Sequence, residues 1–567
     1  MFLYYNIIFN NYLLKMEESF EDNLDDLVIK DKEFRKERTC KRLKVLFIVL
    51  SILIVIIAII IIVWKILSIN YGKIICVYQT FNDNETIDLI NVYEDNPNMK
   101  FYLIINEEKY DQSTSFTFKK AGNHTVEFIF KKKLTSLEFL FKEKEYLIEA
   151  DLSQLEADEI ISLKGTFIEC YNLIKVKFDF AESNNIEDMS NLFRYCSSLE
   201  FVTFNFNTEK VRDMRGLFEY CESLINIDIK NFNTKNLEYM DFMFNGCEKL
   251  ESIDISHFNL EKVKDMTYTF QNCNNAKEIK LPQSYTYNLE YMSGLFMNCF
   301  NIEEVFIDFI KTDKVQEMRE LFMGCEKVSK FNLSHFKTRN VYEISGFFDG
   351  CKSLTSIDLT NFEIIKADSL DKFFKGCSKL REIDLSFIYD PCLIGLKQAF
   401  MNCFNLTSVK LPQKMYGIEH LNSTFENCYD LEYVDLSELK GDEDLLDLDN
   451  MFKNCYKLKN VTFPKMEAEQ LVTARNVFYN CYELEKINMG DFLTDILKNI
   501  DYMFANCHSL IFLNISLFKM DRLENFTNVF EEVNKPIRLI LPKDINPKLM
   551  EVIKNLTITN DSNIDFL

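Results

Sequence analysis

Residues 244–255 read FNGCEKLESIDI, and residues 348–359 read FDGCKSLTSIDL. The pair F-x-x-C in these two stretches recurs fourteen times, at intervals of 26 residues with excursions to 25 or 27. A fixed period of this length is the signature of a solenoid, in which each repeat forms one coil. The copies are Phe167/Cys170, Phe193/Cys196, Phe218/Cys221, Phe244/Cys247, Phe270/Cys273, Phe296/Cys299, Phe322/Cys325, Phe348/Cys351, Phe374/Cys377, Phe400/Cys403, Phe425/Cys428, Phe452/Cys455, Phe478/Cys481 and Phe504/Cys507.

Each copy contains two periodicities. Ahead of the cysteine, apolar residues recur at steps of three, four and seven, as in the segment Val211–Cys221, which predicts a short helix with one apolar face. After the cysteine the step is two, as around Asp358, which predicts a short strand. A unit of this size cannot bury its apolar face alone. We therefore predict an α/β repeat solenoid of the leucine-rich type, with a parallel sheet on its concave face.

The repeated phenylalanines and cysteines are predicted to form the core of the solenoid. Representative members are Phe218, Cys221, Phe244, Cys247, Phe270, Cys273, Phe348 and Cys351. Stacked cysteines would lie within disulfide range, but they continue an apolar face, so we favour buried free thiols over disulfides. Cys76 and Cys392 lie outside this column and could pair only if the segment before the array folded back, which we do not expect. Degenerate copies at Phe141 and Phe530 fit capping coils, for about sixteen coils over residues 134–545.

The frame F-x-x-C-x-x-L-x-x-I-D-L in both quoted stretches resembles the BspA-like leucine-rich repeat. The preceding V-x-x-M-x-x-L-F, as in VRDMRGLF at 211–218, resembles the 26-residue surface-protein variant of that family. The resemblance covers about three quarters of the chain and implies a non-catalytic cell-surface protein, associated with adhesion to cells or matrix. Later copies replace the methionine, as at Ile344 and Leu370, which leaves the fold intact but puts any inherited ligand in doubt.

An apolar segment precedes the repeats. Residues 45–64 contain no charge for twenty residues, the length of a transmembrane helix. Eight basic residues lie from Lys30 to Lys44, so the positive-inside rule predicts that residues 1–44 are cytosolic and that the span is a single-pass type II anchor at the plasma membrane. The mixed acidic and basic charge of residues 1–44 predicts a disordered tail. Cys40 is a candidate for palmitoylation, with a plain free thiol as the alternative. Met16 is an alternative to Met1 as the start.

Residues 71–133 alternate between apolar and polar side chains and contain a turn at Gly122. This pattern predicts a small β-sandwich-like module between the span and the solenoid. Residues 546–567 are assigned to a C-terminal cap or tail.

Composition excludes several classes of function. The chain has 567 residues with 65 Lys and Arg against 88 Asp and Glu, and its net charge of −23 argues against nucleic-acid binding. We find no catalytic motif such as a nucleophile elbow, P-loop or HExxH, and no two of the five histidines share a position that would bind one metal. The sequence therefore predicts no catalytic residues, no metal and no cofactor.

Exposed strand positions seven residues after each cysteine are the candidate binding surface. Phe306 stands out there, because an exposed phenylalanine on a polar strip can anchor a partner, although a solvated face is an equally good interpretation. The candidate ligand-binding residues are Asp228, Asp254, Lys280, Phe306, Asp358 and Asp384. The best candidate glycosylation sites are the N-x-S/T sequons at Asn84, Asn123, Asn555 and Asn560.

The preferred interpretation is a non-catalytic surface protein that presents its solenoid for recognition or adhesion, with a protein or glycan ligand of unknown identity. The first alternative is a structural coat component that self-associates. The second alternative, an enzyme, is disfavoured because no catalytic constellation is found.

Overall fold

The computed structural model describes residues 33–67, 70–92, 99–180, 183–388, 393–412, 415, 417–439, 445–534, 537–556 and 564–566. The chain divides into two compact units, residues 1–70 and residues 71–567. The first unit contains helix α2 (Glu33–Leu67). Its window Lys44–Ile61 has a mean hydropathy of 3.3, and none of it is buried against protein. This window is long and apolar enough to cross a membrane.

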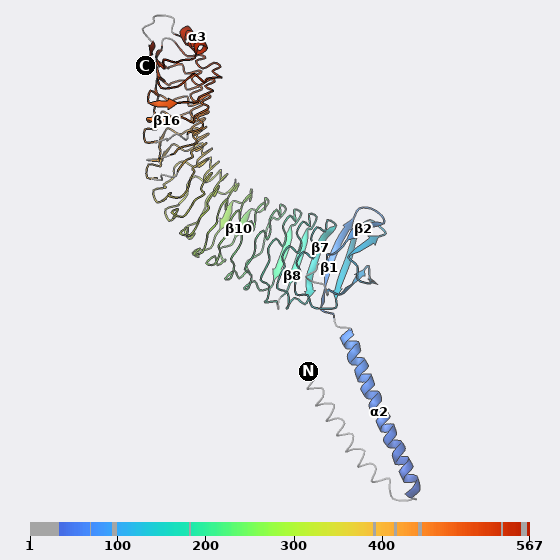
Figure 1. Cartoon of the computed structure of the whole chain (residues 1–567). Coiled ribbons are helices and arrows are strands. Elements are labelled where there is room, and N and C mark those ends of the chain that lie inside the picture. Colours follow the sequence, from blue (N-terminus) through green and yellow to red (C-terminus); the bar gives the residue numbers. More distant parts are fainter. Residues whose placement is uncertain are drawn as a thin grey trace. The chain divides into compact units, whose positions relative to one another are not determined.

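The second unit is a parallel β-solenoid whose coils stack one on the next (Figure 1). Strands of successive coils pair in parallel and in the register of the repeat, so Ile253 lies opposite Ile279. Side chains alternate between exposed and buried along these strands, as predicted. The strands are β7 (Leu147–Leu155), β8 (Lys175–Asp179), β9 (Phe201–Asn205), β10 (Ser252–Asp254), β11 (Glu278–Lys280), β12 (Glu382–Asp384), β13 (Ser408–Lys410), β14 (Tyr433–Asp435), β15 (Asn460–Thr462), β17 (Lys486–Asn488), β19 (Phe512–Asn514) and β20 (Arg538–Leu541), with a second pair formed by β16 (Met466–Ala468) and β18 (Phe492–Thr494).

The described coils around Asp228, Phe306, Asn332 and Asp358 form no regular strand at these positions. The residue that follows each of the four still points into the core. These following residues, Ile229, Ile307, Leu333 and Leu359, are at most 3% exposed. The prediction of one strand per copy is therefore wrong for these coils, while the predicted inward position holds.

The segment before each cysteine is a series of tight turns, so the prediction of a short helix is wrong. The residues five and one before each of the fourteen cysteines have φ between +53° and +76°, as at Tyr268 and Asn272. A right-handed helix cannot contain such left-handed residues. Instead, the N–H groups of Thr269 and Cys273 donate to the carbonyls of Met266 and Phe270, three residues back, at 3.2 Å.

The remaining N–H groups of the turn segment bind the next coil. Tyr268, Phe270 and Asn272 donate to carbonyls one repeat later, at 2.8, 3.1 and 2.8 Å; the acceptors are Ser293, Leu295 and Met297. A further parallel bridge, such as Asp265 with Tyr291, joins the coils eight residues before the cysteine. The turn segments thus form a second hydrogen-bonded ladder along the solenoid, and this ladder replaces the hydrogen bonds that a helix would satisfy internally.

The repeated side chains form continuous columns in the core. The phenylalanine rings stack nearly parallel, with centroids 5.9 Å apart for Phe244 and Phe270 and 5.7 Å apart for Phe270 and Phe296. All eight representative core residues of the sequence analysis are buried: Phe218, Cys221, Phe244, Cys247, Phe270, Cys273, Phe348 and Cys351. The degenerate copies continue the column, because Phe141 stacks on Phe167 and Phe530 on Phe504.

Each ladder cysteine closes a hydrogen bond between coils. The thiol of Cys299 donates to the carbonyl of Phe270 at 3.2 Å, and the same carbonyl accepts the N–H of Cys273. A buried carbonyl with two lone pairs is thereby satisfied twice. All fifteen cysteines whose side chains the structure describes, which excludes Cys40 and Cys392, are free and buried. Burial raises their thiol pKa values, to about 12 for Cys170, because the thiolate would be poorly solvated.

Asparagines stack at the left-handed position before the cysteine in the later coils. The side-chain amide Nδ2 of Asn427, Asn454, Asn480 and Asn506 donates to Oδ1 of the asparagine one coil earlier, at 2.6–2.7 Å. Asparagine tolerates the left-handed region better than most residues, which explains its use there. We call the column Asn402, Asn427, Asn454, Asn480 and Asn506 the asparagine ladder.

Residues 71–130 form strands that continue the sheet of the solenoid. The strands are β1 (Gly72–Thr80), β2 (Glu85–Asp88), β3 (Phe101–Ile105), β4 (Glu108–Tyr110), β5 (Ser115–Phe118) and β6 (Gly122–Phe130). Their order with the first coils is β4-β3-β6-β1-β7-β8-β9, and β2 pairs separately with β5. Strand β1 pairs antiparallel with β7, opposing Cys76 and Ala150. The module therefore extends the sheet beyond the first coil, where Cys76 is free and buried; Cys392, its candidate partner, lies outside the described residues.

A polar clamp fixes this module to the first coil. Lys144, which takes the place of the ladder cysteine there, is 6% exposed, and its Nζ donates to Oδ1 of Asn91 at 2.6 Å. The amide Nδ2 of Asn91 donates to the carbonyls of Phe139 and Lys142. Burial lowers the pKa of Lys144. At the other end, α3 (Pro547–Leu556) follows β20, and β21 (Ile564–Phe566) pairs with β20 in parallel.

The buried thiols predict a pattern of chemical labelling. At neutral pH, a thiol reagent should label none of the fifteen described cysteines in the native chain, because each is buried and protonated. All should react after denaturation without reductant, as read site by site by mass spectrometry. Ladder cysteines that resist labelling in denaturant until a reductant is added would reveal disulfides and contradict the structure.

The asparagine ladder predicts an order of stabilities at position 454. Asn454 has φ +65°, so Asn454→Ala replaces a residue that tolerates the left-handed region with one that does not, and it removes two hydrogen bonds. We expect a loss of about 2 kcal/mol. Asn454→Gly removes the same bonds but tolerates this φ, as Gly350 does four coils earlier in the column, and should cost about 1 kcal/mol less. Urea unfolding of both variants tests this; equal destabilisation would argue against the left-handed conformation.

Candidate binding surface

The predicted binding residues lie in one column on the outer side of the strand segments, seven residues after each cysteine, which we call the strand column. Asp254 and Lys280 stand opposite each other on β10 and β11, and Asp384 stands opposite Lys410 on β12 and β13. Asp228, Phe306 and Asp358 occupy the same position in coils without a regular strand. The register therefore places Asp228, Asp254, Lys280 and Phe306 in four successive coils, and Asp358 and Asp384 in two successive coils further along the solenoid.

The aspartates of this column end their strands by capping the following turn. Oδ1 of Asp254 and of Asp384 each accepts the hydroxyl and the N–H of the serine two residues on, and Asp358 binds Thr360 in the same way. These bonds lower the pKa of Asp254 through the hydroxyl of Ser256 and that of Asp358 through the N–H of Thr360. The sequence analysis missed this role, although D-x-S/T is a known signal for such turns.

Asp384 also forms an ion pair across the strands. Nζ of Lys410 lies 2.6 Å from its Oδ2, and this cation, with the hydroxyl of Ser386, lowers the pKa of Asp384 to about 2. Nζ of Lys280, in contrast, lies 3.2 Å from Oε2 of Glu278 on its own strand. The column is thus a surface of balanced charges whose carboxylates are partly engaged within the protein.

Phe306 is the most exposed aromatic residue of the column, with 63% of its surface accessible. Phe201 on β9 is 60% exposed and lies four coils away, about 19 Å at the strand spacing of a sheet. The two rings therefore do not form one patch. Phe306 remains a single apolar anchor point within a polar strip.

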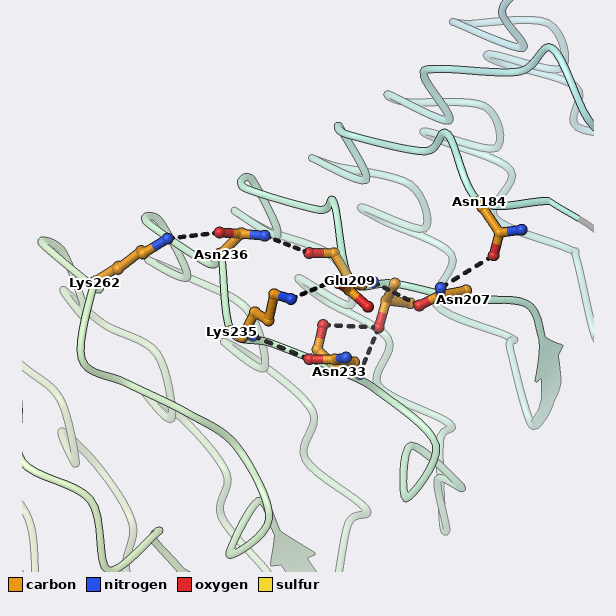
Figure 2. A network of polar contacts seen from close by, with 8 residues as sticks. Asn184, Asn207, Glu209, Asn233, Lys235, Asn236 and Lys262 are labelled. Atoms are coloured by element: carbon orange, nitrogen blue, oxygen red, sulfur yellow. Dashed lines mark hydrogen bonds and ion pairs between the residues drawn. The ribbon is translucent and has the colours of Figure 1, made fainter.

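An outer edge of the coils is occupied by an internal polar network (Figure 2). Nζ of Lys262 donates to Oδ1 of Asn236 at 2.6 Å, and Nδ2 of Asn236 donates to the carbonyl of Glu209 at 2.8 Å. The residue eleven positions before the cysteine alternates strictly between asparagine and lysine over eight coils. These residues are Asn185, Lys210, Asn236, Lys262, Asn288, Lys314, Asn340 and Lys366. On this edge the structural unit is a pair of coils, because each of these lysines donates a hydrogen bond to the asparagine of the coil before it.

Sequence reasoning missed a row of aromatic rings one residue after the cysteine. Phe404, Tyr429, Tyr456, Tyr482 and His508 occupy this position in five consecutive coils and stack on one another. The signal was present in the sequence, because the register of the cysteines places all five in one column. We call these five residues the aromatic row.

The other predicted sites are placed as follows. Asn84 and Asn123 are exposed, at the turn before β2 and in β6. Asn555 belongs to α3 and Cys40 to α2, but their side chains are not described, and Asn560 lies outside the described residues. Among the described residues, no three His, Cys, Asp or Glu side chains are arranged to bind a metal ion.

The ion pair of Asp384 predicts a titration that depends on Lys410. The carboxyl group of Asp384 should titrate near pH 2, and its favourable contribution to folding should fade as the pH falls from about 3.9 toward that value. Because the pair is solvent-exposed, the contribution should be below about 1 kcal/mol. NMR of labelled aspartate should show Lys410→Met raising the pKa of Asp384 while that of Asp358 stays constant. An unchanged pKa at Asp384 would contradict the pair.

Two family models match the chain. A model described as a Mycoplasma protein of unknown function matches residues 111–201, 161–283 and 290–387. A model described as a BspA-type leucine-rich repeat region matches residues 372–511 and 448–546. No curated protein matches the chain.

Two solved structures share 16% sequence identity with the chain. A complex of TLR13 with ssRNA13 covers 72% of this chain with a TM-score of 0.21, and the chain spans about half, 52%, of TLR13. The match to a leucine-rich repeat protein from Eubacterium ventriosum covers 67% of this chain and 82% of the chain of that protein, with a TM-score of 0.25. The repeat motif, its spacing and the matching repeat model together identify residues 372–546 as a BspA-type leucine-rich repeat region.

Proposed function

We propose that this protein is a non-catalytic, cell-surface recognition and adhesion protein. The observation that carries the proposal is the separation of constant and variable positions in the coils. Phenylalanine and cysteine are constant and buried in all fourteen copies, whereas the strand column exposes residues as different as Asp254, Lys280 and Phe306. A rigid scaffold that displays variable side chains in a row suits recognition of a partner.

The chemistry of the described residues supports a binding rather than a catalytic role. The ladder thiols are buried with raised pKa values, which disfavours them as nucleophiles. Leucine-rich solenoids generally bind partners rather than catalyse reactions, and the charged residues of the strand column are engaged in caps and ion pairs. The structure known for TLR13 contains RNA, but the net charge of −23 here favours a protein or glycan partner.

We further propose that α2 anchors the chain as a single-pass type II membrane protein. The apolar window Lys44–Ile61 has the length and hydropathy of a span. Eight basic residues between Lys30 and Lys44 precede it, and this bias favours a cytosolic N-terminus. The solenoid would then be displayed outside the cell, where its surface meets partners.

The first test is topology together with adhesion. A C-terminal epitope tag on the full chain should bind antibody on intact, unpermeabilised cells. Cells that display the chain should then adhere to at least one member of a panel of immobilised matrix proteins and cultured epithelial cells, above cells without it. Staining only after permeabilisation would contradict the proposed location, and display without adhesion to any panel member would contradict adhesion.

The strand column is tested with the same cells. Phe306→Ala and Lys280→Glu should lower adhesion about tenfold if these residues anchor the partner. Lys249→Glu is the matched control, because Lys249 is exposed two residues after Cys247, outside the column, and the substitution makes the same change of charge. Unchanged adhesion for both test variants would reject the strand column as the binding surface.

A further inference from the structure

The aromatic row is a regular surface feature distinct from the strand column. Its ring centroids are 4.9, 4.8, 5.0 and 5.2 Å apart in sequence order, and neighbouring rings are parallel to within 11°. Each ring comes from a separate coil, one residue after the cysteine. The coil spacing therefore fixes the ring spacing, and the row repeats in step with the solenoid.

The row presents hydroxyl groups rather than ring faces. The faces are covered by the neighbouring rings, so the edges and the polar tips are left for solvent. Tyr482 is 38% exposed, and Tyr429 and Tyr456 are partly exposed. None of these three phenol groups makes a hydrogen bond within the part of the chain that the structure describes. Parallel stacking places three free hydroxyl groups in a line at the ring spacing.

The asparagine ladder runs beside this row in the same five coils. Asn402, Asn427, Asn454, Asn480 and Asn506 each lie two residues before a member of the row. Within the ladder, each interior asparagine uses one N–H and one lone pair of its side chain. One further N–H and one further lone pair remain on each amide. The surface therefore offers both donors and acceptors once per coil.

The surface carries little net charge. Next to the row, Lys457 pairs with Asp430 at 2.6 Å between Nζ and Oδ1. The row and the ladder themselves contain no Asp, Glu, Lys or Arg. With a net charge of −23, the whole chain repels polyanions. A neutral ligand suits this surface best.

We propose that the aromatic row and the asparagine ladder together bind a neutral, extended β-1,4-linked polysaccharide along the solenoid axis, one sugar per coil. Such a chain advances by close to one coil spacing per sugar and carries hydroxyl groups, which both donate and accept hydrogen bonds. A peptide strand fits poorly, because its side chains on one face recur only every 6.6–6.8 Å or so. Adjacent sugars of such a chain are turned over relative to each other, but both edges of each sugar carry hydroxyl groups, so each sugar meets the donors and acceptors of one coil.

The size of the surface separates this ligand from a protein partner. Five coils extend for about 20 Å, and two adjacent side-chain columns are about 10 Å wide, so the surface is on the order of 200 Å². A stable protein–protein interface buries about 800 Å² on each partner. A narrow surface of this size suits a single polymer chain and not a globular protein or a second copy of the solenoid.

This inference rests on the proposed recognition function only in assigning the solenoid an external ligand. It concerns another surface, and it can be tested on the purified full chain in detergent, without N-glycans, whatever the topology in cells. A solenoid that faces the cell interior would overturn the proposed location and leave the measured glycan affinity unaffected. Absence of glycan binding would leave adhesion through the strand column intact.

The test is calorimetric titration with cello-oligosaccharides of increasing length, with α-linked malto-oligosaccharides as the comparison. The affinity should rise with length until the oligomer covers five coils and then level off, and the α-linked series should bind at least tenfold more weakly. Tyr456→Phe keeps the stacked ring and removes one hydroxyl group, so it should weaken binding about five- to tenfold. Tyr220→Phe, in the stacked pair of Tyr195 and Tyr220 outside the row, is the matched control and should bind as the wild type does.

Several results would overturn the proposal. The proposal is overturned if the β-linked oligosaccharides do not bind, or if the α-linked oligosaccharides bind equally well. It is also overturned if the affinity does not depend on oligomer length, or if Tyr220→Phe weakens binding as much as Tyr456→Phe does. Light scattering on the same samples covers the alternative partner. Association of the chain with itself that Tyr456→Phe abolishes would assign the row to protein contacts and likewise overturn the proposal.

Discussion

The structure depends on one hydrogen-bonding constraint in the turn before each cysteine. Every second peptide N–H there donates to the next coil, as from Phe270 to Leu295, and the intervening ones close tight turns within the coil. This alternation requires a left-handed residue five positions and one position before the cysteine, and all fourteen coils have both. The coils are consequently locked in register on this side, as the strands lock them on the other.

The constraint explains which residues the coil uses. Glycine or asparagine suits the left-handed position before the cysteine, as at Gly350 and Asn454. The small thiol fits beneath the turn and satisfies the second lone pair of the phenylalanine carbonyl one coil earlier. Exact register also makes surface residues recur in columns, so five adjacent coils can align Tyr429, Tyr456 and Tyr482 with their neighbours into one row.

The buried positions could be predicted from the sequence because burial alone generates their period. Val211, Met214 and Cys221 are buried as expected, but tandem turns share the three-four-seven spacing of a helix, so the backbone prediction was wrong. The glycines and asparagines, poor helix formers, were the signal against a helix. Pairing of β1 with β7 joins segments distant in sequence and leaves no local pattern. The aspartates of the strand column could be located from the register, but not their use as caps.

The most direct measurement of the central claim is the helical content of the full chain by circular dichroism in detergent. The structure has two described helices of 35 and 10 residues in a chain of 567. We therefore predict a spectrum in which helix is a minor component. A helix in every repeat, about eight residues in each of fourteen copies, would more than triple that content. A strongly helical spectrum would contradict turn segments that bind from coil to coil.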